Sequence, residues 1–190
     1  MTKFKSLKRS TQFIIVLILL ASIGIGAYAA SVLWATGHSG TTLSKEHFLT
    51  VELTGSSATG SIKPGGSVAL APAVTNNGDV DAGVFIKVTM PEVSGSAAYV
   101  FEPDSSWYLV EDDGSVQIWS YGTSSALEAV SPGSSTDALT SSFTMRSDIT
   151  GAQFAAMSSV DIGFDGYLID YGEVETSDPE SAWHMIPGNE

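Results

Sequence analysis

Short segments in which apolar and polar residues alternate recur along most of the chain, separated by glycine, proline, asparagine and serine. The clearest covers residues 83–90, where Val84, Ile86 and Val88 alternate with other side chains. Because both faces of this segment carry apolar or β-branched residues, we expect it in the centre of a sheet. Further segments cover residues 49–54, 68–74, 99–101, 107–110, 116–121, 127–130, 139–146 and 160–171. A period of two predicts an all-β fold, an antiparallel β-sandwich of roughly eight to ten strands.

One short helix is predicted within this β-rich region. Thr150 and Gln153 have the spacing of a capping box, and good helix formers follow them, so a helix over residues 151–158 is expected. The chain contains no cysteine, so disulfides cannot stabilise the fold. Apolar burial and strand pairing must therefore do so. Residues 173–190 are acidic, and apart from the apolar stretch 182–186 no regular structure is expected there.

The N-terminus has the order of an export signal. An uncharged apolar run covers residues 13–30 and ends in small residues. Four basic residues precede it: Lys3, Lys5, Lys8 and Arg9. Basic residues stay on the cytoplasmic side while the apolar segment enters the bilayer. The pattern predicts an N-terminal signal helix in residues 1–29, cleaved after Ala29, with Ala27 and Ala29 as the small residues and Ala30 as the new N-terminus. The alternative is a retained anchor, since the run approaches the ~20 residues of a membrane span.

The remaining chain is expected to contain a flexible N-terminal segment, residues 30–46, a β-sandwich domain, residues 47–172, and the acidic segment 173–190. Beyond residue 29 there are four basic residues and 21 acidic ones, a formal charge of −17. A charge of this sign repels phosphate backbones and anionic lipid headgroups. We therefore expect no nucleic-acid partner, and contact with the membrane only through the signal segment.

The flexible segment carries an apolar tip on a polar stalk. Val32, Leu33 and Trp34 precede a stretch rich in glycine, serine and threonine, residues 36–42. Such a tip has nothing nearby in the sequence to pack against. It is a candidate strand for pairing with an exposed sheet edge, either of its own domain or of another copy.

No residue pattern predicts catalysis, a cofactor or a firm metal site. His38, His47 and His184 form no zinc motif. The acidic stretches 111–114 and 76–81 lack the spacing of a calcium loop, so they are interpreted as solvated turns, with weak calcium bridging between subunits as the alternative. The sequence has no Gly-x-Ser-x-Gly motif for a nucleophilic serine. We expect a protein that is not an enzyme.

The aromatic residues permit one further interpretation. Exposed in a row, they could stack on sugars, whereas buried they would contribute to a sandwich core. They are Trp34, Trp107, Tyr108, Trp119, Tyr121 and Trp183. Core packing is the expected role, and binding of cell-wall glycans remains the alternative.

Several motifs together resemble a known family. In order they are residues 62–65 (Ile-Lys-Pro-Gly), 74–78 (Val-Thr-Asn-Asn-Gly), 84–88 (Val-Phe-Ile-Lys-Val), Trp107 with Tyr108, 132–136 (Pro-Gly-Ser-Ser-Thr) and Ala182 with Trp183. With the export signal in front, this order resembles the TasA/camelysin family of exported bacterial matrix and surface proteins, whose signals are removed by a dedicated signal peptidase.

The resemblance implies a jelly-roll-like sandwich that assembles into extracellular fibres, each subunit donating its mature N-terminal segment to the next. It therefore favours a secreted or cell-surface structural subunit of a biofilm matrix or surface fibre, partnered by further copies or by related fibre subunits. Some relatives are described as metallopeptidases, an activity for which this sequence has no metal motif. That activity is the less favoured alternative.

Overall fold

The computed structural model describes residues 49–58, 60–174 and 178–186, all of which belong to one compact unit of the chain. Most of the regular structure in these residues is antiparallel β-sheet, so the all-β prediction is confirmed. The predicted signal helix and the whole of the predicted flexible segment, residues 30–46, lie outside the described residues.

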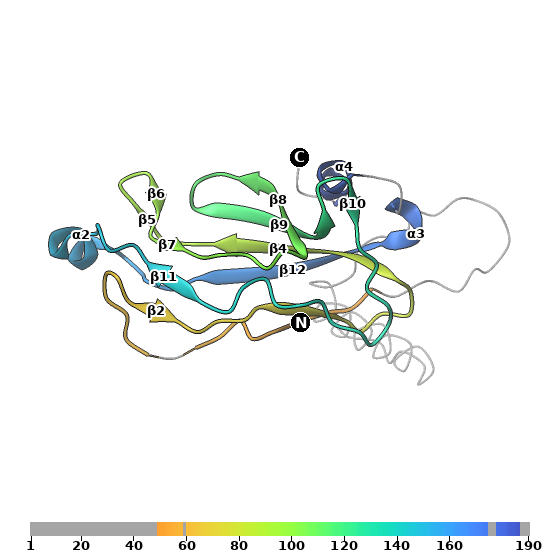
Figure 1. Ribbon diagram of the computed structural model, residues 1–190, viewed down its shortest axis with the longest axis horizontal. Helices are drawn as coiled ribbons and strands as arrows, with labels where there is room; N and C mark the ends of the chain where they lie inside the picture. Colours follow the sequence, from red (N-terminus) through yellow and green to blue (C-terminus); the bar gives the residue numbers. More distant parts are fainter. Residues whose placement is uncertain (1–48, 59, 175–177, 187–190) are drawn as a thin grey trace, which may run out of the picture. The chain divides into compact units, whose positions relative to one another are not determined.

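The largest sheet has five strands, in the order β10, β9, β4 and β12, with β8 also paired to β9 (Figure 1). Its strands are β4 (Ala82–Thr89), β8 (Trp107–Asp112), β9 (Val116–Thr123), β10 (Ala126–Leu127) and β12 (Gly163–Asp170). β4 lies in the interior of this sheet and is buried along most of its length, as its sequence predicted. β12 pairs with β4 over its whole length, from Gly163 opposite Thr89 to Asp170 opposite Ala82.

Two smaller sheets form a second layer. One pairs β1 (Val51–Thr54) with β3 (Ala73–Asn76), and the other has the order β2 (Ser67–Val68), β11 (Phe143–Met145) and β7 (Tyr99–Val100). A separate hairpin joins β5 (Glu92–Val93) to β6 (Ser96–Ala97). All of these pairings are antiparallel.

The main hydrophobic core lies between the two layers. The large sheet contributes Val84, Ile86, Val88, Trp119 and Leu168, and the smaller sheets contribute Val74, Tyr99, Phe143 and Met145. The ring of Phe143 lies 4.5 Å from that of Phe101 and 5.5 Å from that of Phe164, centroid to centroid. Each large apolar side chain buried here stabilises the fold by about 1.5–3 kcal/mol.

The opposite face of the main sheet is covered by the C-terminal part of the chain. Here α3 (Tyr171–Val174) follows β12 directly, and α4 (Pro179–His184) packs on the sheet. Trp183 of α4 packs against Phe85 in a tilted arrangement and against Tyr167 edge to face, with ring centroids 5.4 and 5.2 Å away. The sequence predicted one short helix, but the described residues contain three. Part of the segment 173–190, which was expected to be irregular, is therefore helical.

The cause of this error is local. Asp178 caps α4 by accepting a hydrogen bond from the Ser181 backbone N–H at 3.0 Å, and Pro179 occupies the first turn. These are start signals for a helix. These signals were missed because the surrounding residues are acidic and favoured an irregular segment.

The predicted internal helix is present as α2 (Gly151–Ala156), and its capping box is confirmed. The Thr150 hydroxyl accepts from the Gln153 backbone N–H at 3.3 Å, while the Thr150 backbone N–H donates to the Gln153 side chain at 2.9 Å. The helix ends at Ala156, two residues before the predicted end. The backbone of Met157 is already extended, and its N–H donates to the Phe154 carbonyl.

Several of the predicted strands are shorter than expected; of residues 127–130, for example, only Leu127 belongs to a strand, β10. The segment 68–74 divides into the end of β2 and the start of β3, and Pro72 lies between them. In the segment 139–146 only residues 143–145 form a strand, β11. The preceding residues pair through single bonds instead; for example, the Leu139 N–H donates to the Pro72 carbonyl at 2.8 Å. The alternation of apolar and polar residues predicted which side chains face the core, but not where the backbone pairing between strands ends.

A buried asparagine joins three segments at one end of β3. Asn76 is fully buried, and its side-chain N–H₂ donates to the carbonyls of Val80 (2.8 Å) and Val130 (2.7 Å). Its side-chain oxygen accepts from the Gly78 N–H at 2.9 Å. Its backbone N–H donates to the Ser134 carbonyl at 2.9 Å. Each polar group of the side chain is therefore satisfied, as a buried amide requires.

Candidate assembly edges

The residues predicted to act in export and assembly lie outside the described part of the chain. They are Ala27, Ala29 and Ala30 at the predicted cleavage point and Val32, Leu33 and Trp34 in the predicted donor strand. A donated strand also needs a receiving sheet edge with unpaired backbone groups. The described residues contain sheet edges that can be compared for this role.

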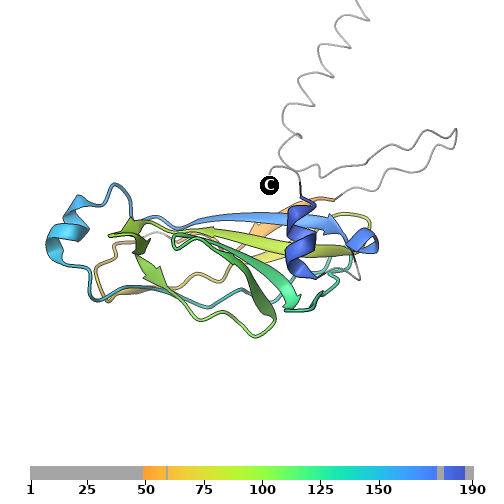
Figure 2. The ribbon, with the colours of Figure 1, turned by 90° about the horizontal axis from the view of Figure 1, so that it is seen from above.

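β12 forms one border of the main sheet and is its longest open edge. Among the described residues it pairs only with β4, so its other side has no strand partner there. Its eight residues run in unbroken register, and alternate N–H and C=O groups therefore point away from β4. Leu168 is buried, but most of the other side chains are partly exposed. Figure 2 shows this strand along one side of the sheet.

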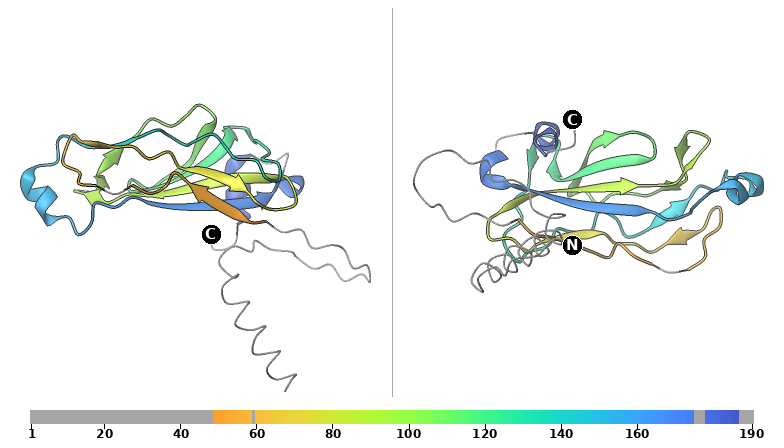
Figure 3. Two further views of the ribbon diagram at one scale, coloured as in Figure 1. Left: turned by 90° about the horizontal axis from the view of Figure 1, so that it is seen from below. Right: turned by 180° about the vertical axis from the view of Figure 1, so that it is seen from behind.

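β1 of the second layer lies against the same border. A Cβ atom added to Gly166 of β12 would lie 3.0 Å from Val51 Cγ2 and 3.4 Å from Val74 Cγ2. The glycine thus lets the two layers approach closely (Figure 3). β1 pairs only with β3 among the described residues. This border, which we call the β12–β1 border, therefore presents one strand edge from each layer.

The edge formed by β8 has features that hinder pairing with another chain. The register of β8 against β9 shifts between Leu109 and Glu111, which marks a β-bulge. Acidic residues at positions 111–113 follow the bulge. Bulges and charged side chains are common means of blocking edge-to-edge association. β12 is consequently the longer and less protected of these two edges.

A cavity of about 410 Å³ opens between β7 and the β8–β9 hairpin. Phe101, Leu109, Trp119 and Arg146 are among its lining residues. The Arg146 guanidinium donates to both carboxylate oxygens of Asp148, at 3.0 and 2.6 Å, and to the Ala97 carbonyl at 3.1 Å. These hydrogen bonds from Arg146 lower the pKa of Asp148. The guanidinium is thus already neutralised by its own neighbour.

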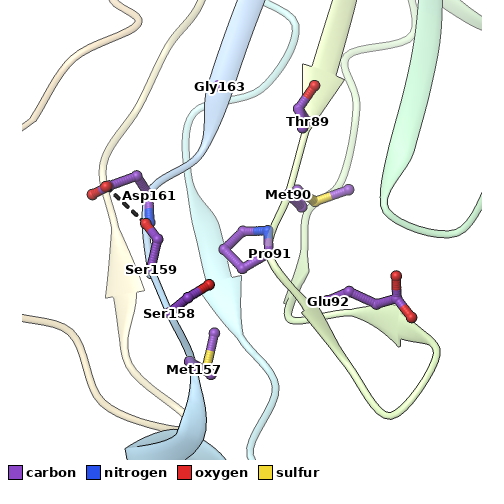
Figure 4. A pocket seen from close by; sticks show the side chains of 9 residues that line it. All are labelled: Thr89, Met90, Pro91, Glu92, Met157, Ser158, Ser159, Asp161 and Gly163. Carbon is purple, nitrogen blue, oxygen red and sulfur yellow. Dashed lines mark hydrogen bonds between the residues drawn. The ribbon is translucent and has the colours of Figure 1, made fainter.

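Two further cavities have no pair of acid and base side chains in their linings. One of about 260 Å³ is lined by Met90, Pro91 and Met157, among others, and its polar contact is a 2.8 Å hydrogen bond from Ser159 to Asp161 (Figure 4). One of about 570 Å³ lies beside the loop 56–62. Neither lining contains histidine, lysine or cysteine.

Tyr99 closes the wall of the 570 Å³ cavity. It is 3 % exposed, and its hydroxyl donates to the Val160 carbonyl at 2.7 Å. Burial, and secondarily the charge of Asp161, raise the pKa of this hydroxyl. The phenol therefore stays protonated and acts as a structural hydrogen-bond donor.

A cavity of about 540 Å³ brings together residues of β4, the β8–β9 hairpin and α4. Glu111, Asp113, Lys87, Trp183 and His184 are among its lining residues. His184 Nε2 lies 3.6 Å from Glu111 Oε1, and both side chains are substantially exposed. Asp112 accepts from the Gly114 N–H at 3.0 Å, which is the contact of a tight turn.

In the ranges that the structure describes, no three histidine, cysteine, aspartate or glutamate side chains converge as ligands of a metal ion would. His38 and His47 lie outside these ranges. Among the described helices, none combines the length and the apolar character needed to cross a membrane.

The described tryptophans belong to the core. Trp107, Trp119 and Trp183 are 5, 7 and 3 % exposed. Tyr108 of β8 is the exposed large aromatic residue among those described. These positions favour core packing over a row of sugar-stacking rings, as the sequence predicted.

Two features of these edges had little signal in the sequence. The close approach of Gly166 to Val51 depends on two strands more than one hundred positions apart. A glycine within an alternating segment was the available sign, because such glycines often mark close backbone approach. The apolar stretch 182–186 indicated that this segment would be buried, but the sequence did not indicate which part of the sheet α4 covers. No family model, curated protein or solved structure matches this chain.

Proposed function

We propose that this chain is an exported structural protein, a subunit of an extracellular matrix or cell-surface fibre. In this proposal residues 1–29 direct export and are cleaved by a signal peptidase after Ala29. The segment 30–46 then pairs with another copy, or with a related subunit, as an added strand. The domain would be a jelly-roll/Ig-like sandwich of the kind the TasA/camelysin resemblance implies. The protein would act outside the cell without enzymatic activity.

The observation that carries the proposal is the open edge of β12. A strand added there can form up to about eight backbone hydrogen bonds, each contributing about 0.5–1.5 kcal/mol net. Association costs about 4–15 kcal/mol, so backbone pairing alone is close to neutral. Burying each of Val32 and Leu33 adds about 1.5–3 kcal/mol. The apolar tip would therefore decide whether the contact is stable.

The surroundings of β12 provide places for these side chains. Tyr167 and Ile169 are half-buried beside the C-terminal helix cluster on one face of the strand. On the other face Gly166 leaves Val51 close to the sheet edge. Consecutive residues of a donated strand point to opposite faces, so Leu33 would lie on one face and Val32 and Trp34 on the other.

The decisive experiment compares two forms by electron microscopy and size: one that begins at Ala30 and one that begins at Lys45. We expect filaments from the longer form and monomers from the shorter. If both remain monomeric and neither forms filaments, strand donation is wrong.

Cross-linking can identify the receiving edge, since the chain has no native cysteine. A Ser31→Cys chain, which keeps the apolar tip intact, is mixed with an Asp165→Cys chain and treated with a short bismaleimide, which tolerates small differences in register. We expect cross-linked dimers. The matched control replaces Asp165→Cys by Tyr108→Cys, which lies on the β8 edge and should give little product. Equal yields from both edges would contradict the assignment of β12.

A further inference from the structure

Asn77 and Gly78 form the one Asn-Gly pair in the sequence and lie in the connection between β3 and β4. The Asn77 side chain is exposed, and neither residue belongs to a strand or helix. Glycine has no side chain to hinder the approach of its backbone nitrogen to the preceding side chain, and it permits many backbone conformations. Both properties of Gly78 favour attack of its backbone nitrogen on the side-chain amide of Asn77.

Hydrogen bonds from Asn77 attach the β3–β4 loop to β1. Its side-chain N–H₂ donates to Glu52 Oε2 at 2.9 Å, and its backbone N–H donates to the Thr50 carbonyl at 2.8 Å. The Gly78 N–H donates to Asn76 Oδ1 at 2.9 Å. The amide at position 77 thus holds a carboxylate of β1 by an attractive contact. Attack by the Gly78 nitrogen requires its N–H to leave Asn76 Oδ1.

We propose that Asn77 is a site of spontaneous deamidation that weakens the attachment of β1 as the protein ages. The Gly78 nitrogen attacks Asn77 Cγ, forming a C–N bond and closing a succinimide ring. The bond from Cγ to the side-chain nitrogen breaks, and ammonia leaves with the proton from the Gly78 N–H. Water then adds to either ring carbonyl and opens the ring. The products are aspartate and isoaspartate, and no oxidant or enzyme is required.

The product reverses the sign of the contact with β1. A carboxylate at position 77 would face the Glu52 carboxylate where an amide N–H₂ now donates. Asp79 and Asp81 lie close in sequence, so the new charge enters an acidic neighbourhood. Like charges on adjacent strands are destabilising. Isoaspartate also lengthens the backbone between β3 and β4. Both products loosen β1, and with it the β12–β1 border, whether or not this border binds another chain.

Mass spectrometry tests the reaction directly. The purified full chain, held in mild detergent because of its apolar N-terminal run, is incubated at neutral pH and digested at intervals. We expect the peptide containing residues 76–78 to gain about one dalton per molecule and to divide into aspartate and isoaspartate forms. A urea-unfolded sample controls for the assay. If the unfolded chain reacts and the folded chain does not, the native contacts block the reaction and the proposal is wrong.

Three variants of the same full chain test the consequence. Asn77→Asp mimics one product, and amide hydrogen exchange in residues 51–54 should accelerate by about two- to fivefold. Adding Glu52→Gln restores a donor opposite the carboxylate and should return exchange close to the wild-type rate. Asn77→Gln retains an amide that cyclises far more slowly, and it should keep its mass during incubation. Unchanged exchange in Asn77→Asp would overturn the link to β1.

Discussion

A single buried amide at Asn76 links β3 to the two segments that flank it. Replacing Asn76 by alanine leaves the Val80 and Val130 carbonyls without their side-chain donor and removes the acceptor of the Gly78 N–H. The Val130 carbonyl still accepts from the Ala82 N–H at 3.0 Å, so the main loss is at Val80 and Gly78. An unsatisfied buried group costs about 1–3 kcal/mol, and we expect Asn76→Ala to lower the free energy of unfolding by about this amount. Urea unfolding followed by tryptophan fluorescence measures this.

The neighbouring asparagine supplies the control. Asn77→Ala removes an exposed hydrogen bond and should change the free energy of unfolding by less than about 1 kcal/mol. If the two variants prove equally stable, Asn76 is not the structural link described above. The sequence indicated a solvated turn at residues 76–81, whereas Asn76 is the buried last residue of β3. It gave no sign of burial, because that depends on residues 130–134, more than fifty positions away.

At the scale of elements, α4 is the least expected and most sharply testable part of the fold. Trp183 is buried against Phe85 and Tyr167, so Trp183→Ala leaves a large cavity on the outer face of the main sheet. We expect a loss of about 3–5 kcal/mol in the free energy of unfolding. Met185, at the end of the same helix, is 54 % exposed. Met185→Ala should cost less than about 0.5 kcal/mol, and a similar loss in both variants would contradict the docking of α4.

The cap of α4 should respond to acid. Hydrogen bonds from the backbone N–H and then the hydroxyl of Ser181 hold the pKa of Asp178 below its ordinary value of 3.8. A carboxylate with a lowered folded pKa stabilises the fold above its unfolded pKa, and this contribution disappears as the pH falls through the folded value. We therefore expect the Ser181 amide resonance in NMR to titrate with a midpoint below 3.8.

Asp178→Asn is the matched variant, because asparagine caps a helix without titrating in this range. Its Ser181 resonance should stay constant as the pH falls, and the wild-type advantage in stability should shrink over the same interval. A wild-type midpoint at or above 3.8 would show that the Asp178 carboxylate gains nothing from the cap.

Strand positions could be predicted because burial on a pleated sheet imposes a period of two, as β4 and β12 illustrate. The α2 helix could be predicted because its capping box is local. The ends of strands were harder to predict. β11, for example, is limited to three residues by pairing with β2 and β7, which are distant in sequence. The short helix α4 docks through one tryptophan, and too few of its residues carry a periodic signal.

At the scale of the whole molecule, the all-β class followed from the sequence, whereas the pairing order did not. β12 pairs with β4 although seven other strands, β5 to β11, separate them in the chain, so no local pattern could place β12 at a border. The border is nevertheless what the proposed assembly uses. Its two strand edges, β12 and β1, come from opposite ends of the described chain.

Charge gives the last test at this scale. The chain beyond residue 29 carries a formal charge of −17, so copies approaching one another repel. The screening length falls from about 30 Å at 0.01 M salt to about 8 Å at 0.15 M. If subunits assemble through strand pairing and apolar burial, light scattering should show faster assembly of the form beginning at Ala30 as sodium chloride is raised across this range. Calcium chloride at matched ionic strength should act equally if screening alone operates, and more strongly if carboxylates are bridged. Assembly that slows with added sodium chloride would mean that attractive charge contacts, rather than the apolar tip and the β12 edge, hold the subunits together.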